Sequence, residues 1–103
     1  MKHQTLTIAE AQRIAEDNIR RRISQSERLS RYQFGPVVFE RDDEYFWTFV
    51  SGSKQLQDEG WVPGALHACV DKVDGHVWTS EEMEEFFTNL LAKEAAERAA
   101  ATA

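Results

Sequence analysis

The segment of residues 45–91 constrains the fold of this 103-residue chain more than any other part. It begins with an aromatic run at residues 45–50, Tyr-Phe-Trp-Thr-Phe-Val, a composition that favours a β-strand. An Asp-Gly pair at residues 74–75 lies between two further β-rich runs, which is typical of a hairpin because glycine accepts the positive φ of the turn. An amphipathic segment follows at once. This order predicts an antiparallel sheet with a helix against it.

Two capping boxes mark the starts of the predicted helices. In each box a threonine is followed three residues later by a glutamate, so that each side chain can accept the other residue's backbone N–H. The two pairs are Thr7 with Glu10 and Thr79 with Glu82. Apolar residues then recur at helical spacing. We expect helices over residues 7–24 and 80–98, with the chain frayed from about residue 99.

The remaining β-rich runs predict an antiparallel sheet of about four strands. These runs cover residues 37–41, 44–51, 66–72 and 76–79. Each helix has a single apolar stripe to bury, so we expect both helices on one face of the sheet. The whole chain, residues 1–103, is expected to form one α+β domain. The expected core contains Trp47, Phe49, Phe86, Phe87 and Leu90.

Charge is distributed unevenly along the chain, whose net charge is −6. Residues 1–34 carry seven basic and four acidic side chains, whereas residues 35–103 carry five basic and fourteen acidic ones. An acidic surface favours basic protein partners over nucleic acid or anionic lipid, although it also serves simply to keep a protein soluble. Cys69 is the single cysteine, so no internal disulfide is expected. No signal peptide or membrane-spanning stretch is recognisable, and we expect a cytoplasmic protein.

The polar residues do not form a pattern typical of an enzyme. His67 and Cys69 point to the same strand face, but neighbours two apart on a strand lie roughly 7 Å from each other, too far for a direct hydrogen bond. Asp71, Asp74 and His76 lack a recognised metal-ligand spacing. The sequence therefore predicts no catalytic, metal-binding or cofactor-binding residue, and we expect a protein that is not an enzyme.

Two further features bear on possible partners. Residues 20–22 are three arginines, which could bind phosphate, but a solvated helix face is the simpler interpretation in an acidic chain without aromatic residues between the basic ones. Residues 45–50 are apolar on both strand faces, so one aromatic surface is expected to stay open or to be covered by a partner. A homodimer through that surface is possible.

Three segments together resemble a known family. They are Trp-Thr-Phe at residues 47–49, Gly-Trp-Val-Pro at residues 60–63 and Val-Asp-Lys-Val-Asp-Gly-His-Val at residues 70–77. In this order they resemble the bacterial polymorphic-toxin immunity family numbered thirty-five, which includes YrhB-type proteins. The resemblance covers about residues 7–80. It implies a small α+β protein that binds and neutralises a co-encoded toxin in the cytoplasm, or a chaperone-like relative, without catalytic residues.

The expected function is therefore a non-enzymatic inhibitor that binds a basic toxin domain by occlusion. The alternative is a small chaperone-like protein-binding module, and a nucleic-acid-binding regulator would rest on the three arginines alone. Carboxylates would steer a basic surface, and a tryptophan on a loop could fill a pocket of the partner. The predicted contact residues are Asp42, Asp43, Asp58, Glu59 and Trp61.

Overall fold

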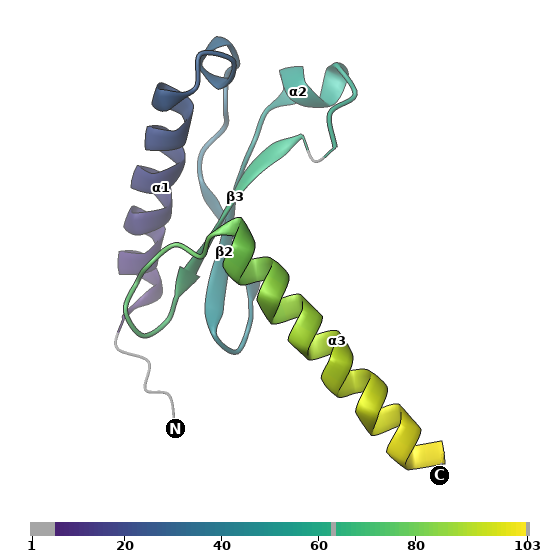
Figure 1. Cartoon of the computed structure of the whole chain (residues 1–103). Helices are drawn as coiled ribbons and strands as arrows, with labels where there is room; N and C mark the ends of the chain where they lie inside the picture. The colour runs from purple at the N-terminus through teal and green to yellow at the C-terminus, as the bar shows by residue number, and fades with distance from the viewer. Residues whose placement is uncertain (1–5, 63, 103) are drawn as a thin grey trace.

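The computed structural model describes residues 6–62 and 64–102, which form an α+β fold with a three-stranded antiparallel sheet and helices at both ends (Figure 1). The sheet order is β1-β2-β3, so that consecutive strands are neighbours. In chain order the elements are α1 (Ile8–Gln25), the 3₁₀ turn η1 (Leu29–Arg31), β1 (Val38–Asp42), β2 (Phe46–Gly52), α2 (Lys54–Asp58), β3 (Ala65–Asp71) and α3 (Ser80–Thr102).

Helix α1 begins at the predicted capping box. The Glu10 amide donates to the Thr7 hydroxyl, and the Thr7 amide donates to the Glu10 carboxylate, both at 3.2 Å. The helix buries one face on the sheet, where Ala11, Ala15 and Ile19 are at most 2% exposed. Two alanines on this face let the helix backbone approach the sheet closely, which leaves room for the larger side chains of the strands.

The strand register separates the two faces of the sheet. On the face under α1, Trp47 lies opposite Val70 and Phe49 opposite Ala68, and all four are buried. On the second face the aligned residues are Phe46 with Asp71, Thr48 with Cys69 and Val50 with His67. The first face is thus wholly apolar at its centre, whereas the second face is mixed.

The predicted fourth strand, residues 76–79, is reduced to a single bridge between Val70 and Val77. The predicted turn before it is present, and Gly75 adopts a φ of 75°, where a side chain would also clash with Leu6 and Ile14. The segment is too short to form a strand, because α3 begins directly after it and is capped by Thr79. Its amide donates to Glu82 at 2.9 Å, as the second capping box predicts.

The expectation that both helices share one face is wrong. Phe86 of α3 contacts Phe46, on the second face, with the ring centroids 5.8 Å apart. Helix α3 then leaves the sheet and projects away from the rest of the chain (Figure 1). Phe87 and Leu90, which we expected in the core, are 41% and 38% exposed. The helix also continues to Thr102, beyond its expected end at residue 98.

The loop between β2 and β3 contains a short helix that the sequence pattern did not predict. The Ser53 hydroxyl accepts the amide of Leu56 at the start of α2, and Leu56 is buried. A serine cap followed by one buried leucine is too short a signal to separate a single helical turn from a loop. None of the helices in the described residues is both long and apolar enough to cross a membrane.

Candidate functional site

The loop after α2 brings three of the five predicted contact residues together. Asp58 ends α2, Glu59 caps it, and Gly60 turns the chain with a φ of 86°. The Trp61 amide donates back to the Leu56 carbonyl at 3.0 Å, which closes the turn. We call residues 58–62 the Trp61 loop.

The Trp61 loop is held against the segment that follows α1. The guanidinium carbon of Arg28 lies 3.8 Å from the centre of the Trp61 ring, a cation–π contact. The Tyr32 hydroxyl donates to Glu59 at 2.9 Å, and this hydrogen bond raises the pKa of Tyr32. Although these contacts fix the loop, Trp61 remains 46% exposed and the neighbouring Val62 is 93% exposed. The loop therefore presents apolar surface to solvent from a fixed backbone.

The other two predicted contact residues, Asp42 and Asp43, lie at the opposite end of β2 from the Trp61 loop. The seven residues of β2 separate the two groups by roughly 20 Å at about 3.3 Å per residue. Each carboxylate has a cation of its own chain: Asp42 lies 2.6 Å from the Lys72 ammonium, and Asp43 lies 3.0 Å from the Arg41 guanidinium. The five residues therefore form two groups, of which only the Trp61 loop combines acidic with apolar side chains.

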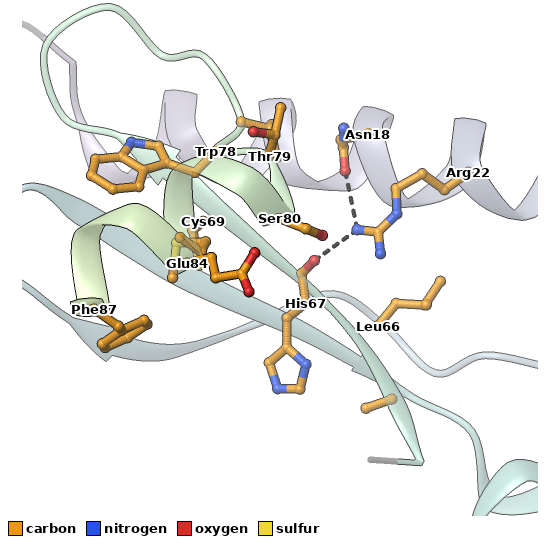
Figure 2. Close-up of a pocket in the computed structure, with 13 residues that line it drawn as sticks. Asn18, Arg22, Leu66, His67, Cys69, Trp78, Thr79, Ser80, Glu84 and Phe87 are labelled. Atoms are coloured by element: carbon orange, nitrogen blue, oxygen red, sulfur yellow. Dashed lines mark hydrogen bonds between the residues drawn. The ribbon is translucent and has the colours of Figure 1, made fainter. Parts of the chain in front are cut away.

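A groove of about 790 Å³ follows the outer edge of β3, between α1 and the start of α3 (Figure 2). Arg22 reaches across it from α1 and donates to the His67 carbonyl at 2.7 Å and to Asn18 at 3.4 Å. Further along, the Trp78 amide donates to the Cys69 carbonyl at 2.8 Å. An edge strand with unpaired carbonyls attracts other strands. These two donors protect that edge of the sheet.

The arginine triplet is thus not one uniform basic surface. Arg20 is exposed and lies 3.4 Å from Asp17, whereas Arg22 is half-buried, and burial lowers its pKa. The sequence interpretation of a solvated face missed the role of Arg22. The signal that could have found it is its position one residue before Ile23, at the border of the apolar stripe, where a long side chain can reach the sheet.

The thiol of Cys69 lies in surroundings that disfavour its ionisation. Burial raises its pKa, and the thiol lies 3.5 Å from the Thr48 hydroxyl. The His67 imidazole pairs with Glu40, with its Nε2 3.3 Å from a carboxylate oxygen. A thiol nucleophile needs a lowered pKa or an adjacent base, and neither is supplied by these neighbours.

Asp71, Asp74 and His76 place their ligand atoms within 4.8 Å of one another, the spacing of a possible cation site. The buried Asp71 carboxylate accepts the amide of Val73 at 2.8 Å and the indole N–H of Trp78 at 3.1 Å. These hydrogen bonds use the carboxylate to close the hairpin. The sequence analysis expected no metal-ligand spacing here, whereas the folded hairpin brings the three side chains together.

His76 connects this hairpin to α3. Its ring nitrogens lie 2.5 Å from Asp74 and 2.9 Å from Glu82, and we call these three residues the His76 clasp. Burial lowers the pKa of His76, but the hydrogen bonds with the two carboxylates outweigh it, so that the pKa is raised. The pKa values of Asp74 and Glu82 are lowered, chiefly by hydrogen bonds from backbone amides and next by the hydrogen bonds with His76. Through Glu82 the clasp connects the hairpin turn to the first turn of α3.

Comparisons of the chain with protein-family models, with curated proteins and with solved structures found no match. The resemblance to the immunity family consequently stays a prediction from the sequence.

Proposed function

We propose that this protein is a non-enzymatic, immunity-type inhibitor that acts in the cytoplasm and covers a basic toxin domain with its Trp61 loop. The observation that carries the proposal is the exposure of Trp61 and Val62 on a loop that also bears Asp58 and Glu59. Exposed apolar side chains with charged neighbours are typical of protein-binding surfaces. The toxin itself is inferred from the family resemblance alone.

The fixed geometry of Trp61 favours binding. A side chain that is ordered before binding loses little conformational entropy when a partner immobilises it. Arg28 and the Leu56 carbonyl already hold Trp61 in place. Tryptophan is also the residue type most enriched among the few that dominate binding free energy.

Charge supports a basic partner. Residues 35–103 have a large excess of acidic side chains, and both carboxylates of the Trp61 loop are exposed. Such carboxylates chiefly increase the association rate with a basic surface, and they do so less at high salt. We therefore expect Asp58 and Glu59 to affect the association rate, and Trp61 to affect the dissociation rate.

The test is binding to the toxin domain encoded beside this gene, measured by titration calorimetry and surface plasmon resonance. Trp61→Ala should weaken binding by about 30-fold or more, as expected for an interface residue worth at least ~2 kcal/mol. The control for the loop carboxylates is the double variant Asp42→Asn and Asp43→Asn. It removes two acidic charges, as many as a change of Asp58 and Glu59 would remove, but at the other end of β2. It should leave the affinity within about threefold.

Two results would overturn this proposal. If the wild-type chain does not bind the toxin domain, the inhibitor function is wrong. If binding survives a triple change of Asp58, Glu59 and Trp61, the interface lies elsewhere on the chain.

A chaperone-like binding module is the second candidate. It is favoured by the exposed apolar side chains of α3, since a module of this kind needs apolar surface to hold an unfolded client. Suppression of the aggregation of a reduced client protein would measure it. A chaperone activity should depend on Leu91 of α3 and should be insensitive to Trp61→Ala, the reverse of the pattern expected for the inhibitor.

A further inference from the structure

Helix α3 carries apolar surface that residues 6–62 and 64–79 do not cover. Phe87 is 41% exposed and Leu91 is 60% exposed, although their spacing is typical of a buried helix face. The radius of gyration is 16.4 Å, compared with roughly 13 Å for a compact chain of this length. The excess reflects the projection of α3 away from the sheet (Figure 1).

We propose that α3 pairs antiparallel with α3 of a second copy of this chain, around a two-fold axis at Leu91. Leu91 is the midpoint of Ser80–Thr102, so this register overlaps the two helices along their whole length. In such a pair, residues equally distant from Leu91 on opposite sides of it face each other across the axis.

The spacing along one side of α3 suits this symmetry. The side is formed by Glu84, Phe87, Leu91, Ala95 and Arg98, all of which are exposed. Successive steps of three, four, four and three residues keep these side chains on one stripe of a helix. Because the order of steps reads the same in both directions, the stripe of one copy matches that of an antiparallel copy.

Charge and size are complementary in this register. Glu84 and Arg98, each seven residues from Leu91, would face each other, so that one acidic and one basic side chain meet on either side of the axis. Phe87 and Ala95, each four residues from Leu91, would place a large ring against a small side chain. A parallel pair would instead place glutamate on glutamate and phenylalanine on phenylalanine. Antiparallel helix dipoles also attract each other.

The end of one helix would reach the base of the other. There a hollow of about 400 Å³ lies between α3 and the second face of the sheet, lined among others by Met83, Phe87 and Cys69. The last turns of α3 are rich in alanine, and these small side chains allow a close approach. The pair therefore gives a reason for the different composition of the two halves of α3.

Sedimentation equilibrium of the full chain, from micromolar to millimolar concentration, tests the pair. An interface of two helices lies at the low end of the size range of specific interfaces, so we expect a dimer that dissociates on dilution. Leu91→Glu places two like charges at the axis and should raise the dissociation constant about 100-fold or more. The matched control Ala96→Glu introduces the same charge on the opposite side of the helix and should leave the dissociation constant within about threefold.

A charge exchange tests the register. Glu84→Arg and Arg98→Glu should each raise the dissociation constant about tenfold, because each places like charges face to face, and the double variant should restore it. A monomeric wild type throughout the range, or equal effects of Leu91→Glu and Ala96→Glu, would overturn the proposal. Failure of the double variant to recover would overturn the register. Trp61→Ala should not alter dimerisation, which keeps this result separate from the proposed toxin binding.

Discussion

The two long helices of this protein both start with apolar residues at helical spacing, but they are buried to different extents. Helix α1 buries Ala11, Ala15 and Ile19 almost completely, whereas α3 leaves Leu90 and Leu91 more than a third exposed. Both begin at a Thr-x-x-Glu capping box. A helical apolar pattern therefore predicts an apolar helix face that is more stable when buried. Whether the same chain buries that face depends on the surface that the helix packs against.

The two faces of the sheet differ in what they offer. Under α1 the sheet presents Trp47, Phe49 and Val70. On the second face His67 pairs with Glu40, and Thr48 lies beside Cys69. Packing a long apolar stripe over the second face would bury charged groups, which is unfavourable unless they keep their partners. Helix α3 contacts this face near its aromatic start, through Phe86 against Phe46.

The largest expected difference between the helices is in stability. Ile19→Ala should lower the free energy of unfolding by about 2–4 kcal/mol, because it opens a cavity in a buried face. The matched change Leu91→Ala should cost less than about 0.5 kcal/mol in dilute solution, where α3 is exposed. Urea unfolding followed by circular dichroism measures both. Similar losses for the two variants would show that α3 is packed against its own chain.

A smaller effect is expected where α3 does contact the sheet. Phe86 is half-buried and packs edge-on against Tyr45, Phe46 and Trp78 at centroid distances of 5.5–5.8 Å. Phe86→Ala should therefore lower the free energy of unfolding by about 1–3 kcal/mol, less than the loss of a fully buried phenylalanine. Phe87→Ala is the control, with an expected loss below about 1 kcal/mol. If the two variants lose the same free energy of unfolding, the part of α3 that packs on the sheet is not the part assigned here.

The smallest expected effect concerns the His76 clasp. The folded state raises the pKa of His76, so its stabilising contribution is present below about pH 6.5 and is lost as the pH rises through the raised value. The pKa values of Asp74 and Glu82 are lowered, so their contributions persist until the pH falls below the ordinary carboxylate range. The clasp is thus strongest between about pH 5 and 6.5.

His76→Gln should therefore reduce the melting temperature more at about pH 5.5 than at about pH 8. Thermal unfolding at the two pH values, with the wild type measured beside the variant, checks this. A difference between the two proteins that grows with pH would contradict the assigned direction. Solvent exposure of the clasp keeps the effect small.

Local features of the fold could be predicted from the sequence. Both capping boxes and the turn at Gly75 are confirmed, because each depends on side chains within three residues of one another. The first three predicted strands lie within two residues of their predicted ranges. The short helix α2 was missed, since one buried Leu56 does not make a helical period.

The part of the candidate site that depends on neighbouring residues could also be predicted from the sequence. Asp58, Glu59 and Trp61 lie within four consecutive residues, so they are close in space in any fold. Asp42 and Asp43 were grouped with them by charge alone, and the length of β2 keeps them apart. The contact of Arg28 with Trp61 spans more than thirty residues of sequence, and no local pattern indicates it.

The starts of the two long helices, the positions of three strands and the hairpin turn follow from the sequence, because hydrogen bonds within a few residues and apolar periodicity define them. The number of strands, the face on which each helix lies and the partner of Arg22 are set by the tertiary structure. These depend on contacts between distant segments, whose free energy is set by the whole surface available to each side chain. For α3, the surface offered by its own sheet is too polar to cover the whole stripe.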